Sequence, residues 1–187
     1  MPARRVAVIV GGLRKDAFSG RVAKALQSLQ PPTIHLEVAE IRDLPLYNQD
    51  LETEDPPAPW IQFRNRIRES DAVLFVTPEN NRGVPGALKN AVDVGSRPWG
   101  KSVWDGKPCG IVSTSPGPLG GFGANHQLRQ NLSFFAMHLL QQPEMYLGRV
   151  DKLVDATGKV ADDSTREMFT KYLAALATFI ERTLIKA

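Results

Sequence analysis

Three loops of this chain carry the residue types best suited to bind a ligand. One is Gly11 to Ser19, which follows an apolar run from Arg5 to Val10. A second is Pro78 to Val84, which follows the β-branched run from Asp71 to Val76. The third is the glycine-rich stretch from Ser113 to Gly123. If the apolar runs are parallel strands, all three loops lie outside the carboxyl edge of one sheet, where open α/β proteins bind ligands.

The first loop has the residue types that bind phosphate. Gly11 and Gly12 permit a tight turn, and the helix expected to follow offers free N–H groups at its N-terminus. Arg14 can add a bidentate, charge-assisted bond, and Ser19 a hydroxyl. The loop has neither the Walker A pattern nor Gly-x-Gly-x-x-Gly, which argues against a P-loop NTPase and a Rossmann dinucleotide site. A plain strand-to-helix connection with a surface arginine is the alternative.

The other two loops can bind a flat, hydrogen-bonding ring. The loop after Pro78 offers backbone amides and the carboxamide of Asn81. The third loop contains Gly117, Gly120, Gly121 and Gly123, and this glycine density lets the main chain approach a flat ligand closely. Each loop alone could be an ordinary surface turn. Three of them at one edge of a sheet predict a site for a planar, phosphorylated ligand.

Composition excludes several other classes of protein. The chain has 187 residues, enough for one domain spanning 1–187, and its charges sum to +3 without a basic stripe, so no nucleic-acid partner is expected. No apolar run approaches the roughly 20 residues of a membrane span, and no signal peptide is recognised. The three histidines are scattered, so no metal site is expected. Cys109 lacks the Cys-x5-Arg loop of a phosphatase, and a lone cysteine indicates a reducing, cytoplasmic location.

Strand-like and helix-like segments alternate along the chain, which predicts a doubly wound α/β sheet with helices on both faces. Strands are expected at 5–10, 34–41, 71–76, 108–114 and 144–147, and helices at 19–29, 60–69, 85–95, 125–138 and 164–184. A long connection rich in proline and acidic residues fills 43–59. Ser164 and Glu167 have the spacing of a capping box for the last helix.

Several motifs resemble one known family over nearly the full chain. Pro78-Glu-x-Asn81, then Val84-Pro-Gly-Ala-Leu-Lys-Asn-Ala-Val-Asp93 and Gly95-Ser-Arg97, resemble the NAD(P)H-dependent FMN reductases of flavodoxin-like fold, which include bacterial quinone and chromate reductases. Gly11-x-Leu-Arg-Lys15 and Ser113-x-Ser-x-Gly117 with Gly120-Gly121 are similar to the family's phosphate and ring loops. The resemblance implies a five-stranded parallel sheet of order 2-1-3-4-5. It also implies non-covalent FMN, NAD(P)H as co-substrate, and a homodimer or a dimer of dimers.

The resemblance also assigns cofactor contacts to all three loops. The residues implied are Gly11, Arg14, Ala17, Phe18 and Ser19 for the phosphate, Pro78, Glu79, Asn80 and Asn81 for the isoalloxazine, and Ser115, Gly117, Gly120 and Gly121 for its other side. Arg82 and Arg97 are candidates to bind the co-substrate's phosphates or an anionic acceptor, with salt bridges as the alternative. Trp99 and Trp104 are expected to anchor a dimer interface, with covering of apolar ligand surface as the alternative.

Five positions depart from the family's pattern, and one of them, Val94 in place of a frequent tryptophan, is expected to affect packing alone. Gly12 and Ala17 stand where serine is usual, Ser19 where asparagine is common, and Asn80 where tyrosine is usual. The two lost hydroxyls shift phosphate binding toward Arg14 and the backbone amides. Loss of the aromatic ring at position 80 is expected to cost about 0.5–1.5 kcal/mol of flavin binding beyond the area lost.

These features predict an FMN-dependent NAD(P)H:acceptor oxidoreductase that works by ping-pong hydride transfer. Hydride would pass to flavin N5 and then to a quinone, with chromate, ferric chelates, free flavins and azo compounds as further acceptors. Because the cofactor carries the chemistry, no catalytic side chain is expected. A flavodoxin-like electron carrier and a flavin-free interaction domain are the alternatives; small carriers tend to be acidic, and this chain has a pI near 9.1.

Overall fold

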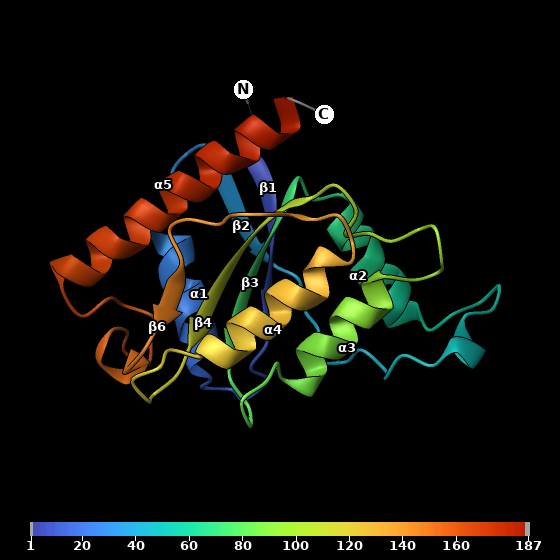
Figure 1. Ribbon diagram of the computed structural model, residues 1–187, viewed down its shortest axis with the longest axis horizontal. Helices are drawn as coiled ribbons and strands as arrows, with labels where there is room; N and C mark the ends of the chain where they lie inside the picture. The colour runs from blue at the N-terminus through green and yellow to red at the C-terminus, as the bar shows by residue number, and fades with distance from the viewer. Residues whose placement is uncertain (1, 186–187) are drawn as a thin grey trace.

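A parallel β-sheet forms the centre of the computed structural model, which describes residues 2–185 (Figure 1). Its strands are β1 (Arg4–Val10), β2 (Ile34–Val38), β3 (Ala72–Pro78), β4 (Pro108–Thr114), β5 (His138–Leu139) and β6 (Met145–Leu147). Their order is β2-β1-β3-β4-β5, and β6 also pairs with β4. Every strand pair is parallel. The predicted order 2-1-3-4-5 is confirmed.

The position beside β4 is shared by two short strands. β5 pairs with Pro108 and Cys109, and β6 pairs with the stretch from Val112 to Thr114. The strand expected at 144–147 is therefore present as β6. The helix expected at 125–138 ends earlier, at Ser133, and His138 belongs to β5. Hydrophobic periodicity could not separate the end of that helix from a two-residue edge strand, because both present similar apolar residues.

The helices cover both faces of the sheet (Figure 1). They are α1 (Phe18–Ser28), α2 (Ala58–Arg68), α3 (Gly86–Gly95), α4 (Phe122–Ser133) and α5 (Asp163–Ile185), with short 3-10 turns at Gln49–Leu51 and Val150–Lys152. α1 and α5 pack on one face, and α2, α3 and α4 on the other. β1 serves both cores, because successive side chains of a strand point to opposite faces: Val6 and Val8 join one cluster, and Ala7 and Ile9 join the other.

The N-terminus of α5 differs from the predicted capping box. The helix begins at Asp163, and Oδ1 of Asp162 accepts the backbone N–H of Thr165 at 2.7 Å. Ser164 therefore lies inside the first turn, and Glu167 pairs instead with Lys171 at 2.7 Å. The pattern misplaced the cap because Asp162 is an equally good capping residue two positions earlier.

Trp104 is not an interface anchor, contrary to the sequence prediction. Its side chain is fully buried, packs against Phe63 and Phe75, and donates its Nε1–H to the carbonyl of Val92 at 2.9 Å. Trp99, by contrast, is 75% exposed. An indole with its N–H satisfied inside the core stabilises the fold.

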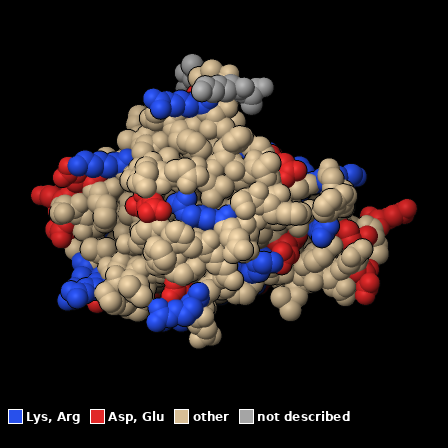
Figure 2. Space-filling view, in the orientation of Figure 1, with Lys and Arg blue, Asp and Glu red and all other residues tan. Residues whose placement is uncertain are grey.

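Acidic and basic side chains are interspersed over the face of the molecule seen in Figure 2. Within residues 2–185, each helix falls short of the length or the apolar character required to span a membrane. The same part of the chain contains no group of three or more His, Cys, Asp or Glu side chains placed to hold a metal ion.

Candidate functional site

A cleft of about 460 Å³ opens at the carboxyl ends of β1, β3 and β4. It is lined by Gly11, Gly12, Leu13, Arg14, Ala17, Phe18, Pro78, Glu79, Asn80, Pro85, Gly86, Ala87, Thr114 and Pro116. The three loops predicted to converge therefore meet at one edge of the sheet.

The N-terminus of α1 opens onto this cleft without a protein cap. Ala17 occupies the N-cap position in an extended conformation and offers no side-chain acceptor to the first-turn amides. The first N–H groups of a helix have no partner within the helix, and the helix dipole makes this end electropositive. The arrangement suits an anionic ligand group, such as a phosphate.

Ser19 lies behind this helix end rather than in the cleft. Its side chain is fully buried, and its Oγ has no hydrogen-bond partner among the described residues. Thr114, which lines the cleft at the end of β4, likewise has a buried Oγ1 without a partner. Buried hydroxyls normally find partners, so two such groups beside one cleft fit a site completed by a polar ligand.

A second helix end and a basic side chain add to the positive character of the cleft. Pro85 occupies the N-cap position of α3, one residue before the helix begins, and provides no side-chain cap. The sequence predicted that Pro85 is the first residue of this helix. In the structure the helix begins one residue later, at Gly86. Arg14 is exposed at the rim and forms no ion pair with any residue from 2 to 185.

The loop after β3 is a tight turn with two residues in the left-handed region. Asn80 and Gly83 exchange both backbone hydrogen bonds, at 3.0 and 2.9 Å. Asn81 (φ 50°) and Arg82 (φ 67°) occupy the two central positions. This is the geometry of a type I′ turn, which favours asparagine at the first central position. Asn80 lines the cleft, whereas Asn81 sits at the tip of the turn.

Two side-chain contacts tie this turn to α4. The carboxylate of Glu79 accepts the N–H of Ala124 at 3.0 Å and so caps α4. The amide oxygen of Gln127 accepts the N–H of Val84 at 2.7 Å. Glu79 thus has a structural function in addition to lining the cleft. The two contacts together fix the turn against α4 at the edge of the cleft.

Gly120 and Gly121 of the third loop allow the loop to pack closely on its neighbours and do not line the cleft. Gly120 and Gly121 have φ of 62° and 75°, and a β-carbon at Gly120 would lie 2.5 Å from the backbone of Tyr146. The hydroxyl of Ser115 accepts the N–H of Gly117 at 3.0 Å. From this part of the chain the cleft is lined instead by Thr114 and Pro116.

Of the cofactor contacts predicted from the sequence, seven line the cleft: Gly11, Arg14, Ala17, Phe18, Pro78, Glu79 and Asn80. Six do not: Ser19, Asn81, Ser115, Gly117, Gly120 and Gly121. Seven further residues line the cleft although the sequence did not assign them as cofactor contacts: Gly12, Leu13, Pro85, Gly86, Ala87, Thr114 and Pro116. The Pro85-Gly-Ala87 start of α3 carried a signal, since a helix N-terminus beside a ligand loop is a place to expect contacts.

The two candidate arginines lie outside this lining. Arg82 is 80% exposed at the turn tip, with its guanidinium 3.9 Å from Glu79. Arg97 is half-buried and lies over the ring of Trp99, 5.4 Å from its centroid. Of the two, Arg82 is on a loop that lines the cleft.

Cys109 has no part in the site. Its thiol is fully buried in β4, and this burial raises its pKa to about 12. A thiolate is the reactive form of cysteine, so this thiol is inert near neutral pH. On the far side of the third loop, burial and a hydrogen bond to Glu144 raise the pKa of Tyr146 to about 12.

The sequence of the chain matches the model of a known protein family. The family model described as NADPH-dependent FMN reductase aligns with residues 4–152. The chain belongs to the NADPH-dependent FMN reductase family. The family prediction made from the three loops is confirmed, and the uncapped end of α1 fits the phosphate of the family's cofactor.

Relatives of this FMN reductase family member extend over nearly its whole length. It is 53% identical over 176 residues to a quinone reductase of Pseudomonas putida, covering 94% of each chain. It is 40% identical to a 2-hydroxy-1,4-benzoquinone reductase of Burkholderia sp, covering 95% of this chain and 97% of the relative. The structure of FerB, a flavoenzyme NAD(P)H:(acceptor) oxidoreductase from Paracoccus denitrificans, superposes with a TM-score of 0.91 at 37% identity, covering 97% and 99% of the two chains.

These comparisons confirm the predicted enzyme class. The protein is an oxidoreductase of the FMN reductase family, with FMN as cofactor and NAD(P)H as co-substrate. An electron carrier without its own reductase activity and a flavin-free domain are the weaker interpretations, because the relatives over the full chain are named as reductases.

Proposed function

We propose that this chain reduces quinones with NAD(P)H by ping-pong hydride transfer at FMN held in the cleft. The observation that carries the proposal is the uncapped N-terminus of α1 beside Arg14, at the carboxyl edge of the sheet. FMN, when bound, supplies the chemistry that accepts and then donates hydride. The chain's own residues bind, orient and shield it.

The phosphate would be held at the end of α1. The amides of Ala17 and Phe18 would donate to it, and the guanidinium of Arg14 would add a charge-assisted pair. Ser19 would act from behind this helix end, where its hydroxyl lacks a protein partner. Gly11 would allow the main chain to pass close to the ligand.

The ring would lie against the turn after β3. Pro78 and Glu79 would offer main-chain groups to its polar edge, with Asn80 at its open side. The tethers of this turn to α4 would keep it from moving when the ring binds. The electropositive end of α3 would favour negative charge on the ring, because preorganised dipoles stabilise charge that develops in the reaction.

The third loop would close the opposite side of the ring. Thr114 and Pro116 line the cleft there, and Ser115 and Gly117 form the turn behind them. Gly120 and Gly121 would shape this loop rather than touch the ligand. Asn81 would hold the turn after β3, and Arg82 and Arg97 remain candidates for the co-substrate's phosphates.

Quinones are the proposed acceptors because two relatives over the full chain are named as reductases of quinones. Such acceptors are flat and would use the place that the nicotinamide ring leaves, so no separate acceptor site is required. Chromate, ferric chelates, free flavins and azo compounds are further acceptors that the same exposed ring could reduce.

A homodimer, or a dimer of dimers, in the cytoplasm is part of this proposal. Trp99, Phe134 and Leu119 are large apolar side chains that are 75%, 70% and 59% exposed, as expected for residues that a second copy covers. Sedimentation of the purified protein would check the oligomeric state.

A visible absorption spectrum tests the proposed function. We expect the protein saturated with FMN to show a flavin spectrum that bleaches on anaerobic addition of NADH or NADPH. Addition of 1,4-benzoquinone should restore the colour within one turnover. Protein that stays colourless after incubation with FMN, or a bound flavin that NAD(P)H does not bleach, would overturn the proposal.

A further inference from the structure

Two more hollows continue from the cleft along the edge of the sheet. The first, about 220 Å³, lies on the other side of the first loop and shares residues 12–14 with the cleft. We call it the basic groove. The second, about 400 Å³, shares residues 38–40 with the basic groove, and we call it the outer hollow. The cleft and the two hollows are therefore neighbours in a row past the ends of β1 and β2, which we call the track, and residues 12–14 of the first loop stand between the cleft and the basic groove.

The basic groove carries four basic side chains and one acidic side chain, so it has an excess of positive charge. Arg14, Lys15, Lys24 and Arg42 line it, and Glu40 is its single acidic side chain. None of the four basic side chains forms an ion pair with residues 2–185. All four are exposed. Such a groove suits phosphate groups, for which lysine and arginine are the usual partners.

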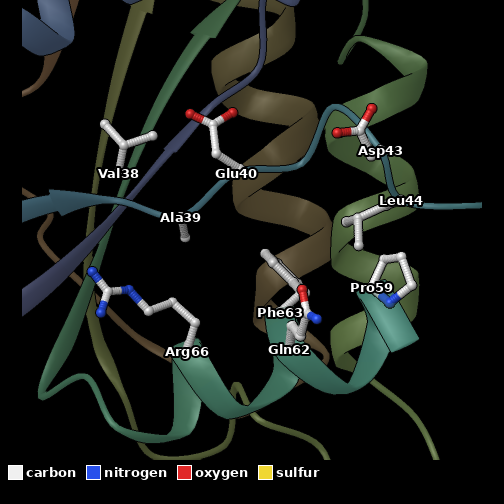
Figure 3. Close-up of a pocket in the computed structure, with 9 residues that line it drawn as sticks. All are labelled: Val38, Ala39, Glu40, Asp43, Leu44, Pro59, Gln62, Phe63 and Arg66. Carbon is white, nitrogen blue, oxygen red and sulfur yellow. The ribbon is translucent and has the colours of Figure 1, made fainter. Parts of the chain in front are cut away.

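The outer hollow has a different character (Figure 3). Leu44, Pro59 and Phe63 form an apolar wall, and the carboxylates of Glu40 and Asp43 lie along its rim. An apolar wall fits a flat base. A carboxylate just past the second strand of an α/β sheet is where nucleotide-binding proteins accept hydrogen bonds from ribose hydroxyls.

The wall of the outer hollow is held in place from the core. The buried carboxamide of Asn90 donates to the backbone carbonyl of Leu44 at 3.3 Å and to that of Pro45 at 3.1 Å. The indole of the buried Trp60 donates to the same Pro45 carbonyl at 3.0 Å. The hollow is thus formed before any ligand arrives, which lowers the entropic cost of binding.

We propose that the basic groove and the outer hollow form a subsite for the adenosine-phosphate half of a dinucleotide. Phosphates would lie among Arg14, Lys24 and Arg42, and the adenosine would lie against Leu44 and Pro59 with its ribose at Glu40. The inference rests on the proposed FMN site, because that site puts the flavin's phosphate at the entrance of the groove. Its recognition depends on side-chain charge, so it needs no Gly-x-Gly-x-x-Gly loop.

Two sources could supply this chemical group. In FAD the adenylate is attached to the flavin's own phosphate, next to the groove. In NAD(P)H it is attached to the nicotinamide that must reach the ring. Both present the same phosphate and adenosine to the track, and binding experiments separate them.

The test compares the parent protein, residues 1–187, with the double variant Lys24→Gln/Arg42→Gln. A matched control, Lys101→Gln/Arg166→Gln, removes the same charge from exposed positions that line none of the three hollows. Three quantities are measured: the dissociation constant for FMN, the binding of ADP to FMN-saturated protein by calorimetry, and the flavin retained from an equimolar FMN and FAD mixture.

We expect FMN to bind all three proteins within a factor of two. If FAD is the source, the parent retains FAD at least tenfold over FMN. If NAD(P)H is the source, FMN-saturated parent binds ADP. In the first case the preference for FAD over FMN, and in the second the affinity for ADP, should fall about tenfold in the double variant. Both should stay unchanged in the control.

A parent that binds FMN but neither prefers FAD nor binds ADP would overturn the subsite and leave the FMN site standing. An equal loss of FAD preference or ADP affinity in the double variant and the control would also overturn the subsite. The net charge of the protein, and not the basic groove, would then explain the binding. A parent that fails to bind FMN would overturn the proposed function itself.

Discussion

A β-carbon added to Gly12 would lie 2.5 Å from Oγ of Ser19, so these two residues share one small space behind the proposed phosphate site. The same β-carbon would lie 2.9 Å from Cβ of Ala17. The departures at positions 12, 17 and 19 are therefore a single packing unit. From the sequence, Gly12 and Ala17 are two separate losses of a hydroxyl group, whereas the structure shows that Ser19 fills the volume that a side chain at position 12 would need.

Gly12→Ala should weaken FMN binding because the added methyl overpacks this space. Overpacking of a close-packed region costs about 1–3 kcal/mol. Adding Ser19→Ala removes the nearest clashing atom, so the double variant should recover part of the loss. Flavin fluorescence titration of both single variants and the double variant measures this coupling. Losses that simply add would show that residues 12 and 19 do not share the space.

Arg14→Ala should weaken FMN binding by about 10- to 100-fold, the range that loss of a hydrogen bond to a charged group produces. The free energy of unfolding should change little, because Arg14 is exposed and forms no ion pair within residues 2–185. Titration with FMN and chemical denaturation measure the two effects. Arg166→Ala, an exposed position on α5, is the control. Equal FMN affinity in Arg14→Ala and the parent would place the phosphate elsewhere.

Glu79→Ala should destabilise the protein by about 1–2 kcal/mol, because it removes the acceptor for the N–H of Ala124 at the start of α4. Glu79→Gln keeps an oxygen at that place and should lose less than half as much. Denaturant unfolding without flavin measures both variants. Similar losses in the two would indicate that the charge of the carboxylate, acting on the helix dipole, matters more than its hydrogen bond.

Arg82→Gly separates the backbone of the turn from its charge. Glycine adopts positive φ at low cost. The free energy of unfolding of the variant should therefore equal that of the parent or exceed it by up to about 1 kcal/mol. If the guanidinium contacts the phosphates of NAD(P)H, the KM for the co-substrate should rise while kcat holds. Arg82→Lys, which retains a positive charge, is the comparison. An unchanged KM in Arg82→Gly would remove Arg82 from the co-substrate site.

Cys109 should make the protein sensitive to alkaline pH. Burial raises the pKa of its thiol from 9.0 to about 12, so between these values the unfolded chain releases a proton that the folded chain retains. Stability from this source is unaffected below pH 9 and falls as the pH rises toward 12. At pH 10.5 the loss amounts to about 1–2 kcal/mol.

Unfolding at pH 8 and at pH 10.5 tests this effect in the parent and in Cys109→Ala. The fall in stability between the two values should be about 1–2 kcal/mol smaller in the variant. The cavity left by alanine costs the same at both pH values, so it cancels from this difference. Identical falls in the two proteins would contradict a buried, protonated thiol.

The loops of the site could be predicted from the sequence because their causes are local. Apolar β-branched runs form the buried strands, and glycine, proline and asparagine mark the turns at their ends. The doubly wound sheet then places those turns at one edge, whatever the details of packing. The convergence of Arg14, Pro78 and Asn80 follows from these features alone.

Contacts between distant segments had no local signal and were decided by the tertiary structure. Trp104 is buried by Phe63 and Phe75, Glu79 caps a helix that starts more than forty positions later, and Gly120 packs on Tyr146. The basic groove joins Lys24 of α1 to Arg42 beyond β2. Residue type and spacing along the chain determine which elements form and where they end. Which side chains face a cleft depends on packing between elements, and that packing exists only once the sheet and its helices have assembled.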